Sequence, residues 1–217
     1  MSSEPRKRHD PRRDATRVAL IEAAESLFAE SGVEGVSTRQ IGAAIGSANT
    51  NVVAYHFGGK EALIEAVYRH RLPVIDRRRG ELLAAAEVAG RGHDLASLVR
   101  IFALPLFEQV DGQGRHSYAR FIGGLERSGL TALRGRVTAE FPETERVTAR
   151  IAACLPPAAP AHVRMRLMAG LLSSALLMID REARGPAEAE ALFAHALAMA
   201  SAALAAPLED MTIKTGE

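Results

Sequence analysis

The stretch from Ser37 to Lys60, STRQIGAAIGSANTNVVAYHFGGK, constrains the fold of this chain more than any other. Ser37 can cap a helix, and Gln40, three residues later, completes a capping box. Apolar residues then recur at helical spacing, which predicts a short amphipathic helix over residues 38–45. Gly46 follows, where a residue in the left-handed conformation commonly ends a helix. This half of the stretch therefore predicts one helix with a defined start and a defined end.

A second short helix is predicted directly after the turn. Asn49 is a good N-cap for a helix over residues 50–55, and two helices this short, joined by a turn of about three residues, form a helix-turn-helix. Val53 and Phe57, four residues apart, supply its inward face. Its outward residues are Thr50, Asn51, Ala54 and Tyr55. A helix that exposes a hydroxyl, an amide and a phenol suits the base edges in a DNA major groove.

Composition limits the class of protein. Of the 217 residues, 47% are hydrophobic and 5% aromatic, which favours a globular chain of packed helices. The net charge of +1 does not by itself indicate a nucleic-acid partner. Residues 1–79, however, carry 13 Lys and Arg against 10 Asp and Glu, whereas the remainder carries 14 against 16. This asymmetry favours an anionic partner at the N-terminal end.

No catalytic, metal or cofactor motif is recognisable. The sequence has no nucleophile–base–acid order, no glycine-rich phosphate loop and no metal-ligand spacing, and its seven His are scattered singly. Cys154 is the single cysteine, interpreted as a small buried hydrophobe with a redox thiol as the alternative. We therefore expect no enzyme, no cofactor and no metal; a helical enzyme is the least favoured alternative.

Neither end of the chain nor its interior indicates a membrane. The charged N-terminus resembles no secretory signal, and the longest apolar run, residues 167–179, is shorter than the roughly 18 residues of a membrane span. The pattern predicts a cytoplasmic protein without a membrane partner.

Residues 1–13 are basic, contain two prolines and are almost free of apolar side chains, which predicts a disordered arm. Two interpretations remain open: a solvated tail, or an arm that becomes ordered on DNA phosphates or in a minor groove. Asp14 can cap a helix that runs to about Ser31, where Gly32 ends it. Its apolar stripe would pack behind the helix-turn-helix, so residues 14–57 are expected to form a DNA-binding head.

Residues 58–217 are predicted to form a second, entirely helical domain. A long helix follows from Lys60 to about Val88, and Pro73 should kink or restart it. The other predicted helices span residues 95–109, 115–127, 142–155, 160–183 and 186–206. The expected fold is all-α with about nine helices, a three-helix head on a helical regulatory and dimerisation domain.

The last two predicted helices, 160–183 and 186–206, are apolar on nearly every side. Such a helix must be buried on more than one side. A symmetric four-helix contact between two copies of the chain achieves this, and Gly170, Ser173 and Ser174 would allow close approach. The pattern predicts a homodimer, with burial inside a monomer as the alternative.

The stretch VSTRQIGAAIGSANTNVVAYHFGGKEALIEAVY resembles the TetR/AcrR family of one-component bacterial transcription regulators, and the resemblance covers about residues 14–70. It implies a homodimer whose two heads read a palindromic operator in double-stranded DNA. It also implies a repressor that a small-molecule inducer releases, and the direction of regulation rests on the resemblance alone. A DNA-binding dimer without an inducer is the alternative, favoured if the C-terminal domain holds no sizeable cavity.

The resemblance further implies roles for individual residues of the head. Thr50 and Asn51 would read bases, since Asn can bond adenine. Tyr55 and His56 would contact sugar and phosphate, while Lys60 and the start of the preceding helix would hold the backbone. The complete DNA-binding set is Thr38, Arg39, Asn49, Thr50, Asn51, Ala54, Tyr55, His56 and Lys60.

An inducer pocket among the C-terminal helices is the second site that the resemblance implies. Binding there would change the spacing of the heads through the helix that starts at Lys60, and would lower the affinity for DNA. Ligand pockets combine apolar walls with a few polar groups. The candidate residues are Phe102, Leu106, His116, Tyr118, Arg120, Phe121 and Met168.

Overall fold

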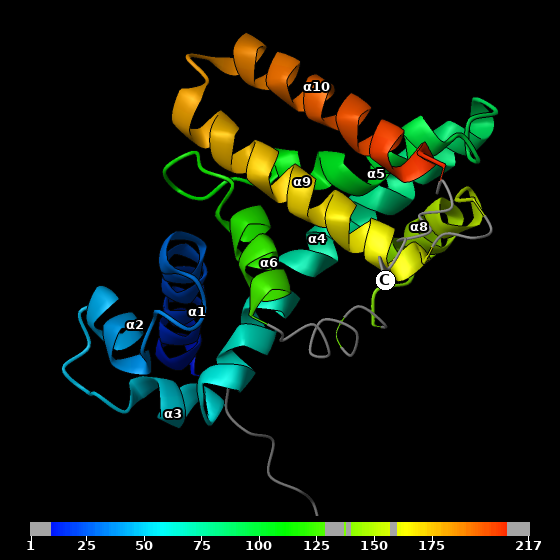
Figure 1. Cartoon of the computed structure of the whole chain (residues 1–217). Helices are drawn as coiled ribbons and strands as arrows, with labels where there is room; N and C mark the ends of the chain where they lie inside the picture. Colours follow the sequence, from blue (N-terminus) through cyan, green and yellow to red (C-terminus); the bar gives the residue numbers. More distant parts are fainter. Residues whose placement is uncertain (1–9, 129–136, 138–139, 157–159, 208–217) are drawn as a thin grey trace, which may run out of the picture.

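The computed structural model describes residues 10–128, 137, 140–156 and 160–207, and its regular elements in these ranges are all helices (Figure 1). The predicted all-α class is confirmed, and each predicted helix is present with ends that shift by a few residues. The helices are α1 (Pro11–Ser31), α2 (Thr38–Ala44), α3 (Val52–Phe57), α4 (Lys60–Val88), α5 (Leu95–Glu108), α6 (Ser117–Arg127), α8 (Pro142–Ala153), α9 (Ala161–Glu182) and α10 (Pro186–Ala205). In Figure 1, α1 to α3 gather at one end of the molecule, and α4 leads from this head into the body.

Helix α1 begins earlier than predicted, which shortens the basic arm. Its N-cap is Asp10 and not Asp14, because the Asp10 side chain accepts a hydrogen bond from the backbone N–H of Arg12 (3.1 Å) and a proline occupies the first helical position. Asp14 lies in the first turn, where a carboxylate still interacts favourably with the helix dipole. Arg12 and Arg13, assigned to the arm, are therefore helical. The rest of the predicted arm, residues 1–9, lies outside the described residues.

Helix α2 starts and ends as its sequence predicts. The Ser37 N–H donates to the Gln40 Oε1 (2.8 Å) and the Gln40 N–H donates to the Ser37 Oγ (3.2 Å), so the capping box is confirmed. Gly46 has φ +70°, in the left-handed region. The Ser47 N–H then reaches back to the carbonyl of Gly42 (3.0 Å), which closes the helix end.

Helix α3 begins later than predicted, because Asn49 closes the turn instead of capping the helix. Its Oδ1 accepts the Asn51 N–H (2.9 Å), and its carbonyl accepts the Val52 N–H (3.2 Å). Asn51 is the N-cap, so Thr50 and Asn51 stand in the turn in front of α3. Val52 and Val53 are both buried, so the inward face of α3 includes Val52 in addition to the predicted Val53.

The two helices of the motif cross closely at Gly42. A Cβ at this position would lie 2.9 Å from the Val52 Cγ1, a distance at which one of the two groups would have to shift. The absence of a side chain at Gly42 therefore sets how near α3 can approach α2.

Helix α4 runs without interruption from Lys60 to Val88, although Pro73 lies in its interior. The predicted alternative of a restart at Pro73 is wrong. Leu72 and Ile75 are buried on either side of the proline, while Pro73 itself is exposed. Packing of these neighbours holds the helix through a position that lacks an N–H.

Two hydrophobic clusters fill the described part of the chain. The first joins the inner faces of α1, α2 and α3 to α4 as far as Ile75, and to Tyr118 and Phe121 of α6. The second lies among the rest of α4 and the helices α5, α8, α9 and α10. The core of the head thus continues past residue 57, and the predicted domain boundary there stays a prediction.

Helices α9 and α10 lie side by side at the far end from the head (Figure 1). Their inward side chains join the second cluster, but large apolar side chains also face outward. These exposed residues are Val163, Leu167, Met178, Leu192 and Met199. Of the described helices, α9 alone is long and apolar enough to cross a membrane, a criterion that core helices of other proteins also meet. Only 28% of its apolar window is buried in the single chain, so one face of α9 lacks a cover.

Candidate nucleic-acid interface

The turn before α3 and the outer side of α3 form an exposed polar surface. Thr50, Asn51, Ala54 and Tyr55 are all exposed, Tyr55 by 66%. The opposite side of the same helix packs into the first hydrophobic cluster. A helix of 6 residues is too short to persist alone, so the packed side must hold the exposed one in place.

The C-terminal end of α3 is held by Arg17 of α1. The Arg17 Nη1 donates to the carbonyl oxygen of His56 at 2.6 Å, and the guanidinium carbon lies 4.2 Å from the centre of the Phe57 ring. One turn earlier on α1, the guanidinium carbon of Arg13 lies 5.7 Å from the centre of the Tyr55 ring. Two cations of α1 therefore flank the end of α3.

His56 is half-buried beside these cations. Its ring meets the Tyr55 ring edge-on, with 5.0 Å between the centres, and its Nδ1 has no hydrogen-bond partner in the described part of the chain. Burial, followed by the positive charges of Arg13 and Arg17, lowers the pKa of the His56 imidazole from its ordinary value. The ring is neutral near pH 7, so in the free protein it can donate a hydrogen bond to a phosphate but carries no charge.

Lowering the pH from about 7.5 to about 5.5 should destabilise the wild-type protein more than a His56→Gln variant. Because the pKa of His56 is lower in the folded chain than in the unfolded one, the unfolded chain takes up the proton first as the pH falls below about 6.5. The contribution of His56 to stability is therefore present above about pH 6.5 and lost as the pH falls toward the lowered pKa. Urea denaturation of both proteins at both pH values measures this difference. An identical pH dependence in the two proteins would refute the pKa assignment.

The remaining predicted head residues lie at two helix starts. Thr38 and Arg39 open α2, where Thr38 is half-buried and Arg39 exposed. Lys60 opens α4, is half-buried, and places its Nζ 5.9 Å from the centre of the Phe28 ring. The predicted set is thus distributed over the starts of α2 and α4, the turn before α3 and the exposed side of α3.

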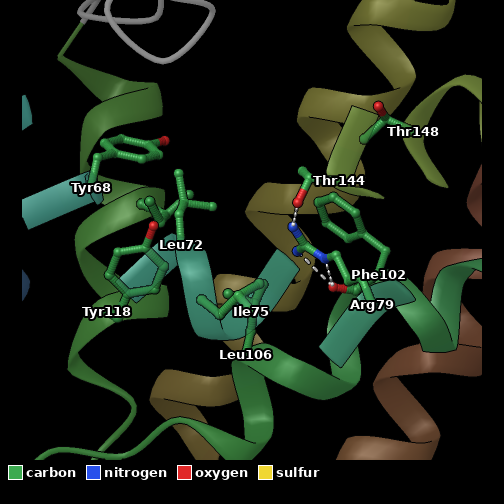
Figure 2. Close-up of a pocket in the computed structure, with 10 residues that line it drawn as sticks. Tyr68, Leu72, Ile75, Arg79, Phe102, Leu106, Tyr118, Thr144 and Thr148 are labelled. Carbon is green, nitrogen blue, oxygen red and sulfur yellow. Dashed lines mark hydrogen bonds between the residues drawn. The ribbon is translucent and has the colours of Figure 1, made fainter. Parts of the chain in front are cut away.

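A cavity of about 50 Å³ lies between α4, α5, α6 and α8 (Figure 2). Phe102, Leu106 and Tyr118 of the predicted pocket set line it. Its polar wall centres on Arg79, which donates to the Phe102 carbonyl from Nε (3.1 Å) and Nη2 (2.8 Å) and to the Thr144 Oγ1 from Nη1 (3.0 Å). The other lining residues are Tyr68, Leu72, Ile75, Ile122 and Thr148.

The other four predicted pocket residues, His116, Arg120, Phe121 and Met168, do not line this cavity. His116 and Arg120 turn toward Asp180 of α9, with 2.5 Å from the His116 Nδ1 to Oδ1 and 3.7 Å from the Arg120 Nη1 to Oδ2. Phe121 and Met168 are buried within the two hydrophobic clusters. Helical periodicity places a residue on an inner face without telling which neighbour that face meets, so it does not separate a cavity wall from solid core.

Residues 20–67 match the family model for bacterial regulatory proteins of the tetR family. The N-terminal head is that of a TetR-family transcriptional regulator. The match lies within the range 14–70 over which the sequence resembles that family, so the predicted family is confirmed.

A solved structure of a TetR-family protein resembles most of the chain. The TetR-family transcriptional regulator PfmR from Thermus thermophilus is 18% identical, with 85% of this chain and 96% of that chain covered and a TM-score of 0.52. At this identity the likeness supports the fold alone. The multidrug binding protein EbrR, complexed with imidazole, is 21% identical over 95% of this chain and 100% of that chain, with a TM-score of 0.43. No curated protein matches the sequence.

The TetR-family match begins at residue 20, so Arg13 and Arg17 lie before it. The sequence predicts that Arg13 belongs to the arm and indicates no role for Arg17. Their spacing of four residues could have indicated a shared face, but only once α1 is known to begin at Pro11.

The described residues outside the head offer no alternative site of metal chemistry. No group of three or more His, Cys, Asp or Glu side chains there could hold a metal ion. Cys154 is half-buried, less covered than predicted, and its Sγ donates to the carbonyl of His93 at 3.4 Å.

Proposed function

We propose that the chain is a cytoplasmic repressor that binds a palindromic operator as a homodimer and leaves it when a small-molecule inducer binds. The observation that carries the DNA-binding part is the exposed surface of Thr50, Asn51, Ala54 and Tyr55, presented by a helix that is packed into a TetR-family head. A helix with a polar outer side fits the major groove. The direction of regulation rests on what is typical of the family.

The proposed contacts divide into base readers and backbone contacts. Thr50 and Asn51 are exposed at the N-terminal end of α3, the end that enters the groove first in helix-turn-helix proteins, and Asn51 can bond adenine. Tyr55 packs on sugar and bonds a phosphate. Arg39 and Lys60, at the starts of α2 and α4, neutralise phosphates and hold the head in register.

The proposed dimer forms through residues 160–183 and 186–206. Its support is the uncovered face of α9, on which Val163, Leu167 and Met178 recur at helical spacing and are exposed by 41%, 67% and 52%. Water-exposed side chains of this size along one stripe gain free energy when a second helix covers them. A second copy of the same pair of helices supplies such a face with closed symmetry.

The proposed inducer site is the cavity that Arg79 borders. Its volume of about 50 Å³ is far below the roughly 300 Å³ of even a small ligand pocket, so a ligand enters only if the helices separate. Tyr68, Leu72 and Ile75 line the cavity from α4, the helix that follows the head directly. Separation of α4 from α5 and α6 would thereby move the head, which couples the ligand to DNA binding.

The small size of the same cavity also favours a second candidate function. A dimer that binds DNA without an inducer needs no cavity in its body, and the space between α4, α5, α6 and α8 has a volume of only about 50 Å³. Retention of operator binding in a broad screen of small molecules would favour this second function.

The first experiment is a titration of the purified protein with a duplex that it selects from a random-sequence library, and with a scrambled duplex. Saturable binding that depends on a palindrome and falls steeply with salt would support the regulator. Weak binding that is equal for both duplexes would refute sequence-specific DNA binding.

Two substitutions separate the proposed roles in the same assay. Asn51→Ala should weaken binding to the selected duplex by about 1–3 kcal/mol and leave binding to the scrambled duplex unchanged. Lys60→Ala should weaken binding to both duplexes and reduce the salt slope by about one. Equal losses on both duplexes for both variants would show that the roles are assigned wrongly.

A further inference from the structure

Arg13 and Arg17 form a pair of cations on α1 that the proposed contacts do not use. They are four residues apart on one helix, so they project from the same face. Their contacts are aromatic rings and one carbonyl oxygen, and neither forms an ion pair with a described carboxylate. Both precede the stretch that matches the TetR family model. Two exposed arginines beside the helix that faces DNA are available for a further role in recognition.

Arg17 satisfies a backbone group that α3 cannot satisfy itself. The last carbonyls of a helix have no partner within it, and in α3 the Gly58 N–H accounts for the carbonyl of Ala54 (2.8 Å). The carbonyl oxygen of His56 instead accepts a hydrogen bond from the Arg17 Nη1, and the Arg17 guanidinium also lies over the Phe57 ring. A positive charge at the C-terminal end further stabilises the helix dipole.

This contact fixes the direction of α3 as well as its stability. The helix has 6 residues and its N-cap makes no side-chain hydrogen bond, so its orientation depends on its packed side and on its two ends. Arg17 ties the last turn of α3 to α1, a helix of 21 residues whose inner face is buried in the head. Rotation of α3 about its own packed valines would break the hydrogen bond to His56.

Arg13, unlike Arg17, is placed to bind DNA and not to orient α3. It makes no hydrogen bond to α3, is exposed, and lies over the edge of the exposed surface at Tyr55. The planar guanidinium of Arg13 can donate two hydrogen bonds to two oxygens of one phosphate, and the hydroxyl of Tyr55 belongs to the same surface.

We propose that Arg17 is a positioning residue that sets the orientation of α3 in the groove, and that Arg13 binds a phosphate of the DNA backbone beside it. The proposal rests on the proposed DNA-binding function of the head. It extends the DNA interface from the helix-turn-helix to α1.

The test compares Arg13→Ala, Arg17→Ala and Arg17→Lys on the selected and scrambled duplexes over a range of salt concentrations. Arg13→Ala should weaken binding to both duplexes by the same factor and reduce the salt slope by about one. Arg17→Ala should lower the ratio of the two affinities about tenfold, because misaligned base readers lose their discrimination. Arg17→Lys should keep the salt slope but not the affinity ratio, since an ammonium cannot both lie on the Phe57 ring and hold the carbonyl as a guanidinium does.

Hydrogen exchange of the free protein provides a readout that needs no DNA. Arg17→Ala should speed exchange of the α3 amides and of Gly58, while Arg13→Ala, the matched control on the same face, should leave them unchanged. Thermal melts of each variant confirm that the head is folded.

An unchanged affinity ratio together with unchanged exchange in Arg17→Ala overturns the positioning role, and an unchanged salt slope in Arg13→Ala overturns the phosphate contact. A wild-type protein that fails to distinguish the two duplexes instead refutes the proposed function. Exchange of the α3 amides and the salt slope on scrambled DNA still test the two arginines in that case.

Discussion

Replacing Asp180 with alanine should lower the free energy of unfolding by about 3–5 kcal/mol, because it leaves the mostly buried Arg120 guanidinium and the His116 donors without their carboxylate. The Asp180 side chain is 3% exposed, and its oxygens accept hydrogen bonds from the His116 backbone N–H (3.2 and 3.1 Å) and from the His116 Nδ1 (2.5 Å). The His116 Nε2 faces the carbonyl of Phe107 at 3.0 Å. Both ring nitrogens of His116 therefore lie within hydrogen-bond distance of oxygen atoms. Arg120, with its Nη1 3.7 Å from Asp180, would lose its carboxylate as well.

Urea denaturation with a linear extrapolation measures the loss. Glu182→Ala, at an exposed position near the end of α9, is the matched control and should change stability by no more than about 0.5 kcal/mol. Asp180→Asn keeps the shape and one acceptor, so it should fall between the wild type and the alanine variant. A loss below about 1 kcal/mol in Asp180→Ala would mean that the buried pair is not formed in solution.

Replacing Glu25 with alanine should cause the second large loss, again about 3–5 kcal/mol. Glu25 is 1% exposed and accepts hydrogen bonds from the Arg71 Nε (2.8 Å) and Nη2 (3.3 Å) and from the Ser117 Oγ (2.5 Å). The carboxylate belongs to α1, and its partners belong to α4 and α6. Its removal leaves the partly buried guanidinium of Arg71 without its counter-charge.

The control is Glu22→Ala, on the same helix and with the same change in charge. The Glu22 side chain is 55% exposed, and its one recorded ion-pair contact is with the His70 Nε2 at 3.9 Å. This substitution should change stability by about 0.5 kcal/mol or less. Equal losses for Glu25→Ala and Glu22→Ala, measured by urea denaturation, would show that burial of Glu25 contributes nothing.

These two buried groups connect the head to the body along α6. Glu25 holds the start of α6 against α1, and Asp180 holds the same end of α6 against α9. Arg120 adds a hydrogen bond from its Nη2 to the carbonyl of Ala29 on α1 (3.3 Å). A movement of α6 in the body must therefore either move α1 or break buried polar contacts, which would give the proposed inducer a second route to the head besides α4.

Most of the head could be predicted because its signals are local. The capping box of Ser37 and Gln40, the left-handed Gly46 and the packed side of α3 depend on groups within four residues of one another. The wrong prediction of the N-cap of α1 also follows from local signals, because more than one residue near the start of this helix can cap it. Asp10 and Asp14 are both able to cap, and the proline after Asp10 decided between them.

The helices, their order, the helix-turn-helix and the apolar faces of α9 and α10 follow from the amino-acid sequence alone, because each depends on backbone capping and a period of 3.6 residues. Which polar groups distant in the sequence meet depends on the tertiary structure. Arg17 and His56 are 39 positions apart, His116 and Asp180 are 64 apart, and Glu25 and Ser117 are 92 apart. It also decided that only three of seven candidate residues line the cavity beside Arg79. Helical periodicity states which side of a helix is inward, but the partner of that side depends on how helices distant in sequence pack together.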